Sequence, residues 1–531
     1  MKLKSRSFLL QLSFLMAALV WPSACSEDAL NLNNNNLVRE DAFWVSETNA
    51  RAAVNGMIHP VPNTFCWGRI LHTGAILRSD VFNIRPFGTN TTMSTFQGGP
   101  GTARWATEPW QEFYKSIFRA NSVLENVNAD NVADQTARNE VLGQAHFMRA
   151  FNYWYLLHFY GNIPLVTQTS QDEADFFPSQ ATPEAVYAQI EDDLNMAANM
   201  LPDEWPDIDA GRATSGAAIA LLGKTQLYQG KWSDAATTFA RIMDGRYDLL
   251  PAERYLENFT EENEFNEEDV FSLQYLGLES FAWGTDVPGV GTLGTYHIDY
   301  APPQKSPDQG HIVNSWVKDL FEANGETVRR DATLAYDYPG STGYGGVPYL
   351  EDFGGDPTDP DDMGDIGVAM NEGLEPVFTR KYAGMDLGTR DQVNFLGANV
   401  GNNWRIIRYA DVLLMRAEAL NESGSTPEAI DLVNEVRTRA QVSMLDRNMG
   451  QEAARQAIID ERVLELTGES HRFFDLVRWG LADDYLGASS LHGDHPKSIS
   501  GGVFQSNKHE FVWIPQSEID ANPNLRQNPG Y

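Results

Sequence analysis

The chain has 531 residues, of which 42% are hydrophobic, and it carries a formal net charge of −34. This length is enough for a large core, which would bury roughly three quarters of the surface that the unfolded chain exposes. The excess of acids disfavours nucleic acid and anionic membrane surfaces as partners, whereas neutral ligands and divalent cations stay compatible with it.

The first 24 residues have the pattern of an export signal. Lys2, Lys4 and Arg6 precede an apolar run over residues 8–21. This run is shorter than the roughly 20 apolar residues that a membrane-spanning helix needs. A basic tip, a short apolar run and then small residues are typical of a secretory signal peptide.

A lipid-anchored cysteine is predicted at the end of this signal. Residues 23–25, Ser-Ala-Cys, resemble a bacterial lipobox, with Pro22 where Leu is usual. Lipidation of Cys25 would leave Cys66 without a partner, and so exclude a disulfide framework and a Cys-based zinc site. Ordinary secretion with cleavage after the small residues is the alternative. The Asn-rich residues 25–40 are predicted to form a flexible tether.

Helix pairs of tetratricopeptide type are predicted in two places. Residues 221–243 and 415–437 both place Gly, Ala and large apolar side chains at the offsets of this roughly 34-residue unit. In the first copy we expect Ser215 to cap the leading helix and Gly230 to end it. Isolated repeats cannot bury their own faces, so further helices must stack on them. The candidates are residues 109–127, 137–160, 183–200 and 453–467.

The stretch between the two copies is predicted to be irregular. Residues 246–404 are rich in Gly, Pro, Asp and Tyr, and residues 311–322 are an exception with a helical stripe. Residues 60–104 share this irregular character, and long segments of this kind are usually functional loops. The predicted organisation is a signal peptide (1–24), a tether (25–40), an N-terminal helical region (41–250) and a C-terminal region (251–531) with an irregular lobe (251–404) and closing helices (405–531).

Motifs for catalysis are missing from the sequence. The chain has neither H-E-x-x-H nor G-x-S-x-G, and its ten His do not cluster at metal-ligand spacing. We therefore expect no cofactor, although a glycosidase pair among the many acids stays open. Residues 356–365 offer carboxylates for Ca²⁺ but lack the Gly and terminal Glu of an EF-hand, so a solvated acidic loop is preferred. The charges of residues 461–480 are expected to form ion pairs between the last helices.

Four stretches carry a family resemblance. They are GQAHFMRAFNYWYLLHFYGNIPLV (143–166), WRIIRYADVLLMRAEALNESG (404–424), ERVLELTGESHRFFDLVRWG (461–480) and EFVWIPQSEIDANPNLRQNPGY (510–531). They resemble the SusD/RagB family over essentially the whole mature chain. The resemblance implies a mainly α protein, with a SusD-like fold of four tetratricopeptide-like helix pairs plus an irregular, loop-rich ligand-binding lobe.

The same resemblance implies a function. It points to a lipid-anchored outer-membrane protein at the cell surface that captures glycan, delivers it to a SusC-like TonB-dependent transporter and does no chemistry itself. Capture of peptide or another nutrient by the same scaffold is the alternative, and a glycan-degrading enzyme is the less favoured one.

The ligand site is predicted among aromatic residues outside the periodic helices. Trp and Tyr rings of helical stripes and of the family motifs are assigned to the core, including Trp154, Trp404 and Trp513. The remaining rings lie beside Gly and Pro, where we expect exposed faces for sugar stacking, and Asp80 and Arg85 are expected to bond sugar hydroxyls. The predicted glycan-binding residues are Trp67, Asp80, Arg85, Trp105, Trp283, Tyr296 and Tyr300.

Overall fold

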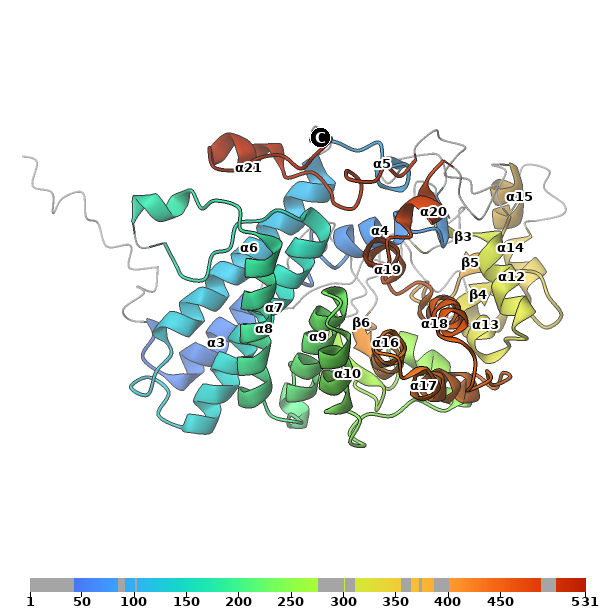
Figure 1. Cartoon of the computed structure of the whole chain (residues 1–531), viewed down its shortest axis with the longest axis horizontal. Coiled ribbons are helices and arrows are strands. Elements are labelled where there is room, and N and C mark those ends of the chain that lie inside the picture. Colours follow the sequence, from blue (N-terminus) through green and yellow to red (C-terminus); the bar gives the residue numbers. More distant parts are fainter. Residues whose placement is uncertain are drawn as a thin grey trace, which may run out of the picture.

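The structure is a computed structural model of the chain, shown in Figure 1. It describes residues 43–84, 91–100, 103–170, 172–275, 300, 311–354, 364–371, 375–385, 401–488 and 503–531. Cys25 and the predicted tether lie outside these residues. Most of the described residues are helical, as predicted, and the helices surround two small sheets.

The helices and strands have the following bounds. The longer helices are α3 (Glu47–Ile58), α4 (Ile70–Leu77), α6 (Ala103–Asn126), α7 (Gln135–Tyr160), α8 (Pro183–Met200), α9 (Ser215–Tyr228), α10 (Trp232–Ala240), α12 (Ser315–Ala323), α15 (Gly364–Asn371), α16 (Tyr409–Glu422), α17 (Thr426–Arg439) and α18 (Gln451–Leu466). The shorter ones are α5 (Thr91–Ser94), α13 (Val328–Thr333), α14 (Tyr349–Phe353), α19 (Arg472–Arg478), α20 (Ala482–Leu486) and α21 (Gln516–Ala521). The strands are β1 (Phe82–Ile84), β2 (Asp269–Leu273), β3 (His311–Val313), β4 (Leu334–Ala335), β5 (Phe378–Thr379) and β6 (Trp404–Arg408).

The long helices pack in a continuous row, from α6 through α7, α8, α9 and α10 to α16 and α17 (Figure 1). The two predicted tetratricopeptide copies correspond to the pairs α9–α10 and α16–α17. They are distant in sequence, yet α10 packs directly on α16. This contact explains how two isolated repeats bury their faces, because each continues the row of the other.

Local sequence explains where these helices begin and end. Thr214, not Ser215, is the N-cap of α9, since its side chain accepts the N–H of Ala217. The prediction was therefore wrong by one residue, and Ser215 is the first helical residue. Gly161 follows α7 with φ +73°, a left-handed conformation that glycine adopts without strain. A side chain at Gly223 would collide with the Phe239 ring, so glycine lets α9 and α10 pack closely.

The two stretches predicted to be irregular, residues 60–104 and 246–404, contain short elements that the sequence period does not show. Strands β1, β3, β5 and β4 form one antiparallel sheet in that order, with Asn83 opposite Ile312. Strands β2 and β6 form a second antiparallel pair, in which Leu273 lies opposite Trp404. The stripe at residues 311–322 is thus a strand followed by helix α12, not a single helix.

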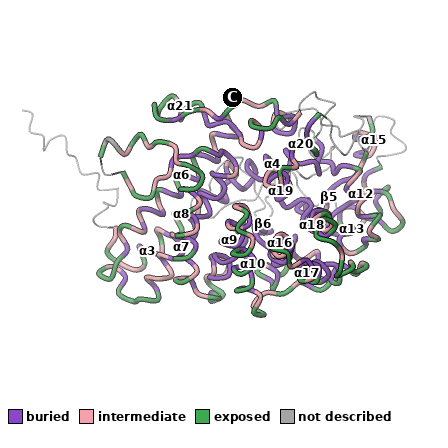
Figure 2. The backbone as a smooth tube through the Cα atoms, viewed as in Figure 1, coloured by how far each residue is buried: buried purple, intermediate pink, exposed green. Residues whose placement is uncertain are grey.

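The core runs through the whole row of helices and into the sheets (Figure 2). Several rings assigned to the core from sequence are buried as predicted, among them Trp154, Trp404 and Trp513. Trp404 is central, because it stacks on Tyr382 with ring centroids 4.2 Å apart and on His72 at 4.5 Å. This aromatic column joins β6 to α4 and to the segment after β5.

Candidate functional site

The rings predicted to contact sugar are buried wherever the structure describes them. Trp67 is 2% exposed, Trp105 5% and Tyr300 0%. Trp67 packs edge-on against Tyr155, with centroids 4.6 Å apart, and the hydroxyl of Tyr300 donates to the carbonyl of Gly468 at 3.1 Å. The expectation of exposed loop rings is wrong for these three residues. Groups distant in sequence contact Trp67 and Tyr300, and Trp105 lies in helix α6 and not in a loop.

Asp80 is likewise buried, and it serves as an anchor. Its carboxylate accepts from Nε and Nη2 of Arg472, both at 2.9 Å, and its carbonyl accepts from the indole of Trp316 at 2.9 Å. This bidentate ion pair ties the segment after α4 to α19. Arg85, Trp283 and Tyr296 lie outside the described residues.

The charges of residues 461–480 form the predicted ion pairs. The densest group, here called the ion-pair cluster, comprises Glu268, Lys381, Arg408, Arg439, Glu465 and Glu469. In it, Arg408 contacts Glu469 at 2.7 Å and Glu465 at 3.0 Å. Burial by itself raises the pKa of Glu469, but Arg408 and Lys381 outweigh this effect and the net pKa is lowered. The cluster joins β6, α17 and α18, and its burial leaves no face for a ligand.

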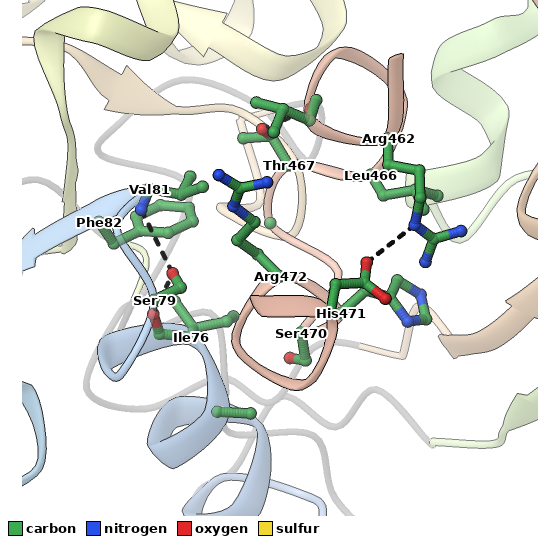
Figure 3. Close-up of a pocket in the computed structure, with 14 residues that line it drawn as sticks. Ile76, Ser79, Val81, Phe82, Arg462, Leu466, Thr467, Ser470, His471 and Arg472 are labelled. Carbon is green, nitrogen blue, oxygen red and sulfur yellow. Dashed lines mark hydrogen bonds and ion pairs between the residues drawn. The ribbon is translucent and has the colours of Figure 1, made fainter. Parts of the chain in front are cut away.

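A small cavity lies beside these charges, between α4 and α18–α19 (Figure 3). Its volume of about 20 Å³ is enough for a water molecule and far too small for a sugar. Arg472 extends between Val81 and Thr467 in the close-up. Nη1 of Arg472 and Nη2 of Arg462 have no hydrogen-bond partner among the described residues. The cavity therefore fits an internal water and not the ligand site.

Two larger hollows adjoin each other beside β2, and we call them together the double cleft. The first has a volume of about 430 Å³ and lies against α3 and α7; the second, of about 460 Å³, lies against the N-terminus of α9. Both volumes are in the range of small-molecule sites. Residues 210–212 and the strand residues Phe271 and Ser272 line both hollows, so they form the wall between them.

The wall of the double cleft depends on a glycine. Gly211 has φ +85°, and a side chain there would collide with Gln274 and Phe265. The Gln274 amide donates to the carbonyl of Gly211, which holds the 207–212 segment against the end of β2. Ile208, in the short 3-10 turn Asp207–Asp209, is 94% exposed, and Phe265 is 43% exposed. The cleft therefore presents apolar side chains beside polar ones.

The two arginines of the double cleft are held by carboxylates. Arg212 contacts Asp209 at 2.6 Å and donates to Gln144 at 3.1 Å. Arg246 contacts Asp203 at 2.7 Å. The hydroxyl of Ser215, followed by the Arg246 guanidinium, lowers the pKa of Asp203.

One residue that lines the first hollow, Tyr275, lies close in sequence to the predicted site residue Trp283. The N–H of Tyr275 donates to Oδ1 of Asn403 at 3.0 Å, and the N–H of Asn403 donates to Glu264 at 2.6 Å. Burial raises the pKa of Glu264 to about 7. Sequence reasoning missed these cleft residues, although Pro206 and Gly211 flanking the lone Ile208 are a turn signal.

In the described ranges, His, Cys, Asp and Glu side chains form no group suited to a metal ion. None of the helices in the same ranges combines the length and apolar character that a membrane crossing requires.

Comparison with known proteins agrees with this architecture. The SusD family model matches residues 302–531, and a family model described as "Starch-binding associating with outer membrane" matches residues 92–227. SusD-like protein P2 of Formosa agariphila is 28% identical over 96% of this chain and 97% of its own. The chain belongs to the SusD family.

Two solved structures extend the comparison to the fold. A SusD superfamily protein from Bacteroides vulgatus superposes with a TM-score of 0.75 at 24% identity, covering 92% of this chain and 100% of that one. A structure titled "Laminarin binding SusD-like protein" has a TM-score of 0.70 at 26% identity, with the same coverage. The predicted family and SusD-like fold are thereby confirmed.

Proposed function

We propose that this protein is a glycan-binding lipoprotein of the cell surface, which captures oligo- or polysaccharide and delivers it to a SusC-like TonB-dependent transporter. The observation that carries the proposal is its similarity to the laminarin-binding SusD-like protein across 92% of the chain. The family model described as starch-binding adds support. Glycan binding needs a hollow lined by apolar faces and hydroxyl partners, which the double cleft provides.

The proposed ligand contacts combine the double cleft with predicted site residues that lie outside the described ranges. Sugar rings would pack on Phe265 and Ile208, while the side chains of Gln274 and Asn55 meet hydroxyls. Trp283, Tyr296 and Arg85 stay proposed as further contacts from sequence. Trp67, Trp105, Tyr300 and Asp80 are not retained as contacts, because each is buried in the described structure.

Titration calorimetry with laminarin, starch and unrelated oligopeptides tests this function directly. We expect at least one neutral glycan to bind and the peptides not to bind. Trp205 lies in the wall of the second hollow, so ligand-dependent change of tryptophan fluorescence gives an independent readout. Binding of peptides in place of every glycan would replace this function with the peptide-capture alternative.

We further propose that the protein binds without chemistry and without a cofactor. When purified protein is incubated with a glycan that it binds, the chain length of the glycan should stay unchanged. Cleavage that a single carboxylate substitution abolishes would contradict this. Binding should also persist in EDTA, and its loss would indicate a Ca²⁺ role for residues 356–365.

The anchor and the partner are tested in cells. Lipidation at Cys25 is expected to hold the protein in the outer membrane, because several acyl chains anchor stably where one does not. Cys25→Ala should release it from membranes when the transporter is deleted. The intact protein should copurify with a TonB-dependent barrel, whereas a protein purified alone under the same conditions would argue against delivery.

A further inference from the structure

The two arginines of the double cleft already form ion pairs with carboxylates of the protein. Arg212 pairs with Asp209 at 2.6 Å, and Arg246 pairs with Asp203 and Asp244, each at 2.7 Å. A carboxylate or sulfate on a ligand is best held by the two parallel N–H groups of a guanidinium. The Nε, Nη1 and Nη2 groups of Arg246 all bond Asp203 or Asp244, so Arg246 would have to leave these carboxylates before it could hold such a ligand. Arg212 bonds Asp209 through Nε and Gln144 through Nη1, so a ligand would compete with Gln144 there.

The acids of the double cleft exceed its cations. Six acids and two arginines line the two hollows: Asp203, Glu204, Asp207, Asp209, Glu267, Asp269, Arg212 and Arg246. Glu267 pairs with Arg254 and Asp269 with Arg405, both from outside the cleft. Glu204 and Asp207 are exposed and have no ion-pair partner among the described residues. The cleft therefore presents a negative surface to an approaching ligand.

The other polar groups of the cleft suit hydroxyls. Asn55, His59 and Gln274 line the first hollow, and Tyr247 and Asn266 line the second. Amide, imidazole and phenol groups both donate and accept hydrogen bonds, as sugar hydroxyls do. The exposed apolar surface of Phe265 and Ile208 adds packing area that requires no charge on the ligand.

We infer that the double cleft selects an uncharged polysaccharide segment and rejects chains that carry carboxylate or sulfate groups. This inference rests on the glycan-binding function proposed above and names its ligand class. An anionic sugar in the cleft would lose the hydration of its charged groups, meet like charges and find both arginines already paired with protein carboxylates. A neutral sugar avoids all three costs, and the discrimination should weaken as salt screens the charges.

The test compares neutral polysaccharides with charged derivatives of the same backbones and with naturally charged polysaccharides. Laminarin, starch, xylan and mannan are each compared with their carboxymethyl derivatives by calorimetry at about 20 mM and about 500 mM salt, where the Debye length falls from roughly 20 Å to roughly 4 Å. Alginate and pectate complete the panel. We expect the neutral form of any bound glycan to bind at least tenfold more tightly at low salt, with a smaller ratio at high salt.

The other outcomes of this test distinguish a failure of the proposed charge selection from a failure of the proposed glycan binding. A carboxymethyl form, alginate or pectate that binds as tightly as any neutral glycan overturns the inference and leaves glycan binding in place. Binding of no glycan at all rejects both.

A double variant and a control variant test whether the acids of the double cleft cause the preference for neutral over charged polysaccharide. Glu204→Gln combined with Asp207→Asn should reduce the ratio between neutral and carboxymethyl binding at least threefold. Asp484→Asn, an exposed acid on α20, is the control and should leave the ratio unchanged. An unchanged ratio in the double variant, with the fold intact by circular dichroism, would overturn the role of the cleft charges.

Discussion

The ion-pair cluster and the double cleft are both rich in charged side chains, but they differ in burial and in balance. In the ion-pair cluster, Arg408 is 1% exposed and contacts three carboxylates. In the double cleft, Arg246 is 25% exposed, and its partner Asp203 is 72% exposed. Charges removed from water must be paired almost completely, whereas charges at a surface hollow can stay in excess. The number of charged residues in a stretch of sequence therefore does not reveal which region binds a ligand.

The largest expected effect comes from breaking the ion-pair cluster. Arg408→Ala should lower the free energy of unfolding by about 3–5 kcal/mol, because it leaves Glu268, Glu465 and Glu469 buried with fewer partners. Urea denaturation followed by circular dichroism measures this. Arg447→Ala is the matched control, since Arg447 pairs with Asp431 at 2.7 Å on the surface, and its effect should be far smaller. Equal effects of the two variants would show that burial does not distinguish these pairs.

The second largest effect is expected at Trp67, and it tests whether this ring is a core residue. Trp67→Ala should cost about 3 kcal/mol or more of unfolding free energy, because it leaves a cavity between Tyr155 and Trp404. Phe118→Ala, at a ring that is 56% exposed on α6, should change stability by no more than about 0.5 kcal/mol. Thermal melting of both variants compares them. A Trp67→Ala protein that melts like the parent but loses glycan binding would restore the stacking role expected from sequence.

Acid should destabilise the fold in two steps. Burial lowers the pKa of His471 and of His509 to about 4, from an ordinary value of 6.5. Between pH 6.5 and 4 the unfolded chain thus binds more protons at these residues, and stability falls as pH falls. Glu264, with its pKa raised to about 7, opposes this between pH 7 and 4.5. Below pH 4.5, protonation of Glu469, whose folded pKa is lowered, removes further stability.

Urea unfolding at pH 7, 5.5, 4.5 and 3.5 measures this dependence. We expect the unfolding free energy to fall at each step, and His471→Gln should flatten the change between pH 6.5 and 4.5. An unfolding free energy that stays constant or rises down to pH 4.5 would contradict the buried neutral state of these histidines.

The smallest effect concerns the double cleft. Phe265→Ala should weaken binding of a neutral glycan about fivefold, about 1 kcal/mol, because it removes an apolar face that is 43% exposed. The melting temperature should hardly change. Met444→Ala, at an exposed apolar side chain beyond α17, is the control. Unaltered binding by Phe265→Ala would exclude this ring from the ligand site.

Periodic segments were predictable because their pattern reports local structure. The predicted helix at residues 183–200 has the bounds of α8, and that at 137–160 matches α7 except for its first two residues. The ion pairs of residues 461–480 were also expected, since this run is dense in both Arg and acids and has Phe473, Phe474 and Leu476 between them. Their partners were not, because Arg329 and Lys381 come from segments without helical period.

The candidate site was predictable only in part. Trp67 lies in aperiodic sequence beside Gly and Pro, which suggested exposure, yet the rings of Tyr155 and Trp404 pack against it. Trp105 was expected in a loop, but it lies in the first turn of α6 and is buried. The double cleft was not predicted at all. Its walls come from α3, α7, the 207–212 segment and β2, which no spacing in the sequence relates to one another.

The sequence by itself determined the family, the helical repeats and the placement of most core rings, because helix period and repeat offsets depend on neighbours within a few turns. The tertiary structure decided which aromatic rings are buried, which acids are paired and where a ligand-sized hollow opens. These properties depend on contacts between segments far apart in the chain. The contact of α10 with α16 and the ion pair of Asp80 with Arg472 are two examples.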